Sequence, residues 1–205
     1  MFGVGNNGTV EGRVDVVIVG AGFAGMYMLH SCRQAGLSAV VFERGGGVGG
    51  TWYWNRYPGA RCDVPSLEYS YQFSEELQQE WEWSEKYATQ PEILRYAEHV
   101  ADRFDLRRDI KFNSTVTSIS YDDASNTWTT NLADGTATMS RFVVSAVGCL
   151  SSANRPRFVG DDEFAGQILH TGEWPHDGVD FTGKDRKSTR LNSSHSSVSR
   201  MPSSA

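Results

Sequence analysis

The chain has 205 residues, of which 39% are hydrophobic and 12% aromatic, a composition typical of one globular domain. Its 25 acidic residues outnumber its 19 lysines and arginines, so the net charge is -6. Such a chain lacks the basic excess that neutralises nucleic-acid phosphates, and we expect no nucleic-acid partner. No apolar run reaches the roughly 18 residues of a membrane span, and residues 1–10 lack a signal-peptide pattern. We therefore expect a soluble cytoplasmic protein, without membrane association or an evident protein partner, that acts on small molecules.

The cysteines and histidines indicate neither a disulfide framework nor a metal site. Cys32, Cys62 and Cys149 are odd in number, lie far apart and form no CxxC pair. The histidines are not spaced as metal ligands. We expect small buried thiols and no bound metal.

The first half of the chain begins with a strand-helix-strand pattern. Residues 14–20 form a β-branched run that ends in glycine, which is typical of a buried parallel strand. Apolar residues then recur at helical spacing over 22–35, and Gly36 follows as a stop signal. Residues 39–43 form the second strand. This order predicts a right-handed βαβ unit.

Further elements follow the βαβ unit. An apolar stripe over residues 91–106 predicts a helix that packs on the sheet. Residues 110–121, 127–132 and 136–147 read as successive strands, separated by turn residues at Asn126 and at Asp134-Gly135. We therefore expect an α/β fold, a Rossmann-like βαβ sheet with an antiparallel β-meander insertion.

The loop between the first strand and helix matches GxGxxG in the required context. Gly20 allows the tight turn, Gly22 lets a pyrophosphate approach the backbone at the helix N-terminus, and Gly25 lets helix and strand pack closely. Glu43 lies at the end of the second strand, where a carboxylate accepts hydrogen bonds from ribose hydroxyls and repels a 2'-phosphate. The pattern predicts a site for FAD or NAD rather than NADP.

Two spaced motifs carry a family resemblance. The segment from Val48-Gly49-Gly50-Thr51-Trp52 through Tyr57-Pro58-Gly59 to Asp63 is the first, and the second, F-x-G-x-x-x-H-x-x-x-W-P, is matched by Phe164, Gly166, His170, Trp174 and Pro175. Over residues 14–184 the chain resembles the flavin-dependent Baeyer-Villiger monooxygenases, the family of phenylacetone and cyclohexanone monooxygenases.

The resemblance implies FAD and NADPH as cofactors and assigns roles to individual residues. It implies FAD contacts from Gly20, Gly22, Ala24, Gly25, Glu43, Thr51, Trp52, Tyr53, Trp54, Asp63, Tyr69 and Val116. It also implies that Arg61, Cys62 and Asp63 face the nicotinamide, with Asp63 as the catalytic residue that holds an arginine not identifiable in this chain. Trp52 and Trp54 could instead be core residues, and Asp63 an ordinary loop carboxylate. His170 and Trp174 fit a structural or hinge role better than proton transfer.

The expected domain organisation is that of a truncated FAD domain. Residues 1–13 read as a flexible start, 14–150 as the N-terminal part of the FAD-binding domain, and 151–184 as a linker toward an NADPH domain whose own GxGxxG is absent. Residues 185–205 are serine-rich without an aromatic residue and resemble translated vector sequence, so we expect a disordered, non-native tail.

The resemblance implies an NADPH-dependent enzyme that inserts one oxygen atom of O2 into a ketone through a flavin C4a-peroxide, giving an ester or lactone. Two alternatives stay open: an N- or S-oxygenating flavin-containing monooxygenase, and a non-catalytic FAD-binding fragment. For the present residues alone we expect no turnover.

Overall fold

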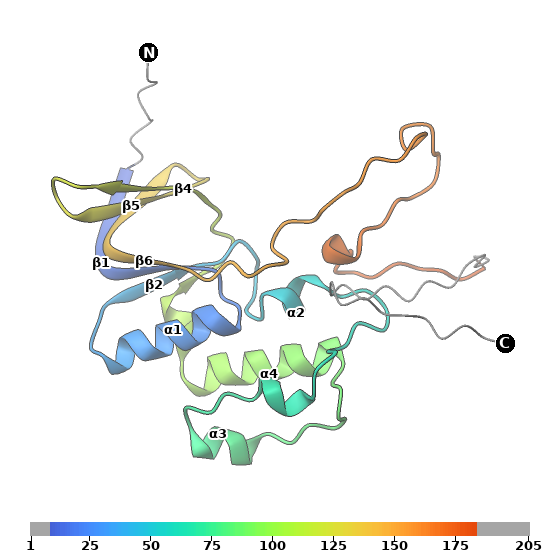
Figure 1. The fold of residues 1–205 in the computed structure, drawn as a ribbon, viewed down its shortest axis with the longest axis horizontal. Coiled ribbons are helices and arrows are strands. Elements are labelled where there is room, and N and C mark those ends of the chain that lie inside the picture. Colours follow the sequence, from blue (N-terminus) through green and yellow to red (C-terminus); the bar gives the residue numbers. More distant parts are fainter. Residues whose placement is uncertain (1–8, 184–205) are drawn as a thin grey trace.

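The computed structural model describes residues 9–183, so the expected tail at 185–205 and the first eight residues lie outside the described part. Six strands form one mixed sheet (Figure 1). They are β1 (Thr9–Val19), β2 (Ala39–Phe42), β3 (Ile110–Lys111), β4 (Val116–Asp122), β5 (Thr127–Leu132) and β6 (Thr136–Ser145). The order across the sheet is β3-β2-β1-β6-β5-β4. Strands β3, β2, β1 and β6 run parallel, whereas β4, β5 and β6 form an antiparallel meander.

Helices and short 3-10 turns connect the strands. The α-helices are α1 (Phe23–Gln34), α2 (Thr51–Trp54), α3 (Glu75–Glu80) and α4 (Gln90–Arg103). The 3-10 turns are η1 (Ser66–Tyr69), η2 (Leu106–Asp109) and η3 (Thr171–Glu173). In Figure 1, α1 and α4 lie on one side of the sheet, and the segment after β6 runs away from the sheet toward η3.

The last residues of β1, from Val16 to Val19, are apolar on both faces of the sheet because both faces are covered there. Val16 and Ile18 pack against α1 and α4, where Met26 and Tyr96 belong to the same buried cluster. Val17 points to the other face, into a smaller cluster that contains residues of the meander. A continuous apolar run is therefore what this central strand needs.

The α/β class, the parallel βαβ unit and the antiparallel meander predicted from the sequence are confirmed. Strand β1 begins at Thr9, so residues 9–13 pair with β6 and the expected flexible start does not extend over them. Helix α4 ends at Arg103, three residues before the end predicted from the sequence, because Asp105 adopts a left-handed conformation with φ of 48°. The turns α2 and α3 were not expected from periodicity.

The prediction of a single strand over residues 110–121 is wrong. Ile110 and Lys111 pair with β2 as a third parallel strand, whereas β4 starts at Val116 and pairs with β5. The chain turns between them at Asn113, which has a φ of 53°. Asparagine tolerates this left-handed conformation better than most residues. The turn ends β3 and changes the direction of the chain, so that β4 pairs with β5.

Substitution of Gly25 tests the close packing of α1 on β1. A Cβ atom at Gly25 would lie 1.9 Å from the carbonyl oxygen of Gly20, so the helix must shift. We expect Gly25→Ala to lower the free energy of unfolding by about 2 kcal/mol or more, the cost typical of overpacking. Urea unfolding followed by circular dichroism measures it.

Gly12→Ala is the matched control, because a Cβ atom there meets nothing within 4 Å. It should leave the unfolding midpoint within experimental error. A Gly25→Ala protein as stable as wild type would contradict the packing argument.

Candidate functional site

A crevice of about 1210 Å³ opens at the carboxyl ends of β1, β2 and β6. This is the position at which ligands bind in open parallel sheets. The crevice is lined by nine of the residues predicted as site residues: Gly20, Gly22, Ala24, Glu43, Thr51, Trp52, Trp54, Tyr69 and Val116. The sequence motifs therefore converge on one cavity.

The phosphate-loop glycines permit backbone approaches that a side chain would block. Gly20 has a φ of 102°, and a Cβ atom there would lie 2.7 Å from the carbonyl oxygen of Ala146. Gly25 is buried against the Gly20 carbonyl rather than in the crevice, so it acts through packing. Gly22 is the N-cap of α1, and no side chain caps this helix or places an acidic group in its first turn. The helix N-terminus therefore offers backbone N–H groups and positive potential to an anion.

Gly49 and Gly50, in the glycine-rich segment before α2, contact the phosphate loop. A Cβ atom on Gly50 would lie 2.9 Å from the Cα atom of Gly22. Gly50 has a φ of 55° and is the N-cap of α2. The glycine-rich segment and the phosphate loop are thus in backbone contact, and the Gly49 N–H donates a 3.0 Å hydrogen bond to the Ala21 carbonyl.

Glu43 is a buried carboxylate that joins these loops. Its side chain is 5% exposed, and its two oxygens accept hydrogen bonds from the Ala21 N–H at 2.8 Å and the Gly45 N–H at 2.7 Å. It lines the crevice, as predicted for a ribose-binding carboxylate. Each oxygen has a further lone pair, so the backbone bonds leave acceptor capacity for a ligand hydroxyl.

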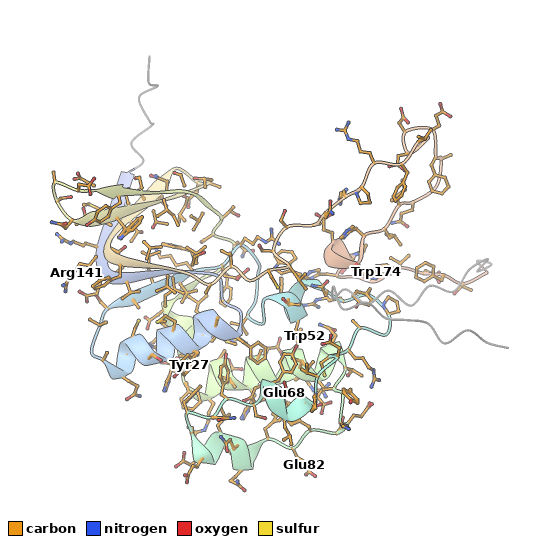
Figure 2. The ribbon with its side chains drawn as sticks, viewed as in Figure 1. Tyr27, Trp52, Glu68, Glu82, Arg141 and Trp174 are labelled. Atoms are coloured by element: carbon orange, nitrogen blue, oxygen red, sulfur yellow. The ribbon has the colours of Figure 1, made fainter. Side chains whose placement is uncertain are left out.

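Aromatic residues form one wall of the crevice. Trp52 is 6% exposed and packs in a buried cluster with Ile93 and Leu94, between α2 and α4 (Figure 2). Its ring makes an edge contact with Tyr69, with centroids 5.6 Å apart, and Tyr69 makes a second edge contact with Phe23. Burial raises the pKa of the Tyr69 hydroxyl, which therefore stays a neutral donor. Trp52 thus belongs to the buried core and also lines the crevice, while its predicted contact with FAD stays a prediction.

Helix α2 is held in place from two sides. The Gln90 side-chain amide donates a hydrogen bond to the Trp52 carbonyl oxygen. Tyr53 lies outside the crevice lining, where its hydroxyl accepts a 3.0 Å hydrogen bond from the Gly46 N–H. Tyr53 therefore supports the glycine-rich loop, whereas Trp52 and Trp54 on the same helix reach the crevice.

Arg61, Cys62 and Asp63 do not line the crevice. Their segment forms an isolated antiparallel bridge with the start of α4, in which Arg61 pairs with Thr89. The Arg61 guanidinium makes a 2.7 Å ion pair with Glu85 at the surface. Cys62 is buried, as is Cys32, whereas the expectation of a buried thiol is wrong for Cys149, which is exposed. Asp63 is exposed. Its predicted catalytic role therefore has no support from the shape of the crevice.

The second motif lies next to the first, and the contact is made by His176, the residue directly after the motif, which the sequence analysis did not single out. The His170 ring caps η3, because its Nδ1 accepts a 3.1 Å hydrogen bond from the Gly172 N–H. Trp174, on the segment after η3, stacks loosely on Phe181 (Figure 2). His176 instead makes edge contacts with Tyr53 and Trp54, with centroids 4.9 and 5.8 Å apart.

Sequence reasoning also missed several lining residues, among them Phe23, Arg44, Tyr71 and Phe73. The alternation of Tyr69, Tyr71 and Phe73 is a signal that could have found two of them. Arg44 directly follows Glu43 and lines the cavity, but no local sequence signal indicates this position.

Fold and crevice together define a dinucleotide-binding protein. The family model for pyridine nucleotide-disulphide oxidoreductases matches residues 17–177, so the chain belongs to this family. It is similar to the acetone monooxygenase (methyl acetate-forming) of Gordonia sp. strain TY-5, at 44% identity over 171 residues that cover 83% of this chain and 32% of that protein. It is also 44% identical, over 164 residues, to the phenazine N-monooxygenase of Lysobacter antibioticus, with 80% of this chain and 30% of that protein covered.

A solved structure of oxidized steroid monooxygenase bound to NADP superimposes with a TM-score of 0.79 at 62% identity, covering 83% of this chain and 33% of that one. The resemblance to flavin-dependent Baeyer-Villiger monooxygenases is confirmed by these relatives. The chain spans about a third of the length of the relatives it matches.

Within residues 9–183, no helix is long and apolar enough to cross a membrane. The same residues contain no group of three His, Cys, Asp or Glu side chains placed to hold a metal ion.

The Glu43 bridge should contribute to stability even without a ligand. In Glu43→Gln, one of the two backbone N–H groups loses its acceptor, because an amide has a single oxygen. We expect the free energy of unfolding of the ligand-free chain to fall by about 2 kcal/mol, as for loss of a hydrogen bond to a buried charged group. Urea unfolding measures it.

Glu68→Gln is the matched control, since Glu68 also lines the crevice but is exposed. Equal stability of Glu43→Gln and Glu68→Gln would show that the bridge contributes nothing.

Proposed function

We propose that this chain binds FAD and is part of an NADPH-dependent flavoprotein monooxygenase that oxidises a ketone with O2 to an ester or lactone. One observation carries the proposal: the GxGxxG loop, Glu43 and the fingerprint residues Thr51, Trp52 and Trp54 line a single crevice at the strand ends. Bound FAD would supply the redox and oxygen-activating chemistry.

The residues present fit such a cofactor. The uncapped N-terminus of α1 suits the pyrophosphate, and Gly22 and Gly50 leave its approach free of side chains. Glu43 has acceptor capacity for the ribose, and the wall formed by Trp52 and Tyr69 offers an apolar surface to a flat ring. The chain would therefore bind and orient the cofactor and exclude water from one side of it.

The predicted catalytic role of Asp63 is part of this proposal. Asp63 is exposed beside the Arg61 bridge, so its carboxylate is accessible to regions of the longer protein. We propose that it positions a cationic group contributed by those regions near the nicotinamide of NADPH.

The open edge of β6 supports the proposal that turnover requires further regions of the longer protein. Strand β5 pairs with β6 only from Ala137 to Ser140. Among the described strands, nothing pairs with the outer edge of residues 142–145, and Phe142 is 51% exposed there. An unpaired edge with exposed apolar side chains is a site for further strand pairing. We infer that residues 1–205 alone bind the cofactor without turnover.

N-oxygenation is the second candidate activity. The identity to a phenazine N-monooxygenase equals that to a ketone-oxidising relative, so this third of the protein does not separate the two substrate classes. The ketone assignment rests on the His170–Pro175 fingerprint. The three cysteines are free, which favours a reducing compartment, and we propose the cytoplasm.

Binding of FAD is the direct test. The purified chain should bind FAD, and Glu43→Gln should raise the dissociation constant about tenfold, because a hydrogen bond to a charged acceptor is worth about 1.5 to 3 kcal/mol. Quenching of flavin fluorescence gives the constants, with Glu68→Gln as the control. An affinity unchanged in Glu43→Gln would refute the ribose role.

Turnover should require the natural continuation of the chain. We expect no ketone-dependent NADPH oxidation by residues 1–205, because we propose that regions of the longer protein position the nicotinamide against the flavin. Even a misplacement of about 1 Å between reacting groups can cost on the order of a hundredfold in rate. A chain extended by its natural sequence should oxidise NADPH when a ketone is added and release the ester, measured by absorbance at the nicotinamide band and by chromatography. An extended enzyme that oxygenates amines but no ketone would move the assignment to the second candidate.

A further inference from the structure

Arg44 occupies a position in the crevice to which neither motif assigns a role. It follows Glu43 at the end of β2 and lines the main crevice. It also lines a neighbouring cavity of about 370 Å³, together with Trp54 and Thr115. These three residues therefore separate the two cavities. The Arg44 side chain is exposed, so its guanidinium is accessible from the crevice.

The guanidinium is held by an aromatic ring. Its central carbon lies 4.7 Å from the centroid of the Trp54 ring, within the range of a cation-π contact. Trp54 is fixed in turn by α2 and by an edge contact with Tyr53. A planar guanidinium with one face on a ring has its second face available for another flat group.

Residues 113–116, which lie beside the end of β2, indicate which part of a dinucleotide would contact the free face of the Arg44 guanidinium. The Ser114 N–H donates a 2.8 Å hydrogen bond to the Glu43 carbonyl, and the Asn113 N–H donates a 3.0 Å bond to the Gly45 carbonyl. These bonds bring Thr115 and Val116 beside Arg44, and all three line the crevice. Glu43 fits the ribose, so the group bound beyond the ribose at this end is the base.

We propose that Arg44 is a specificity-determining residue that stacks on the adenine, so that the base lies between the guanidinium and the Thr115–Val116 segment. The Trp54 ring supports the guanidinium from behind. The inference rests on the proposed function, because it names the part of the cofactor that this end of the crevice selects. The predicted selectivity is for an adenine nucleotide over the same diphosphate without a base.

Stacking and simple charge attraction make different predictions. Lysine keeps the positive charge but has no planar group to stack, whereas methionine removes both the charge and the planar group and keeps an unbranched stem. If Arg44 stacks on the base, both substitutions weaken binding of an adenine nucleotide. If Arg44 only attracts phosphate, lysine restores binding.

Calorimetric titration of the 205-residue chain with ADP and with inorganic pyrophosphate tests this. We expect Arg44→Lys and Arg44→Met each to weaken ADP binding about five- to tenfold, the lower end of the range for loss of one base-stacking contact, and to leave pyrophosphate binding unchanged. Arg56→Met is the matched control. Arg56 stacks on the neighbouring Tyr53 ring, at 5.0 Å, but does not line the crevice.

Each other outcome overturns the inference. If Arg44→Met weakened binding of ADP and of pyrophosphate equally, and Arg44→Lys bound both like wild type, Arg44 would be a phosphate contact. Unchanged ADP binding in both variants, with circular dichroism spectra like wild type, would leave Arg44 without a role in binding. FAD titration of the wild-type chain separates the two levels: absence of FAD binding contradicts the proposed function itself, whereas FAD binding that is insensitive to Arg44 contradicts only the stacking.

Discussion

The crevice depends on one buried carboxylate. Glu43 links the phosphate loop to the glycine-rich loop, because its two oxygens accept hydrogen bonds from Ala21 and Gly45. Without the Glu43 carboxylate these two N–H groups would lose the acceptors shown here, and an unsatisfied buried N–H group is costly. The same side chain thus joins the two loops, lines the crevice and keeps lone pairs that these backbone N–H groups do not use. Under the proposed function, these lone pairs would accept hydrogen bonds from a ribose.

The part of the site around the phosphate loop is formed by backbone rather than by side chains. Gly20 lies against Ala146, Gly25 against Gly20, and Gly50 against Gly22, at separations that leave no room for a Cβ atom on the first residue of each pair. These contacts bring β1, β6, α1 and α2 to one point. An anion bound there meets N–H groups and the α1 dipole, which are rigid because the surrounding backbone is packed.

The sequence predicted those features that local chemistry determines. The βαβ unit, GxGxxG and Glu43 all lie where expected, since strand periodicity and glycine geometry are local properties. The split of residues 110–121 into β3 and β4 was not predictable from alternation, because it depends on which partner strand each half meets. Arg44 and His176 were missed for a related reason: they act by contacting rings of α2, and that helix carries no periodic signal in four residues.

Helix α2 is where the two sequence fingerprints come together. Its rings Tyr53 and Trp54 contact His176, which directly follows the second motif, and Arg56 and Arg44 stack on them. Burial and the nearby charge of Arg56 lower the pKa of His176, because a charged imidazole would be poorly solvated and repelled by the guanidinium. Since Trp54 lines the crevice and also contacts His176, the segment after η3 packs against one wall of the crevice without itself lining it.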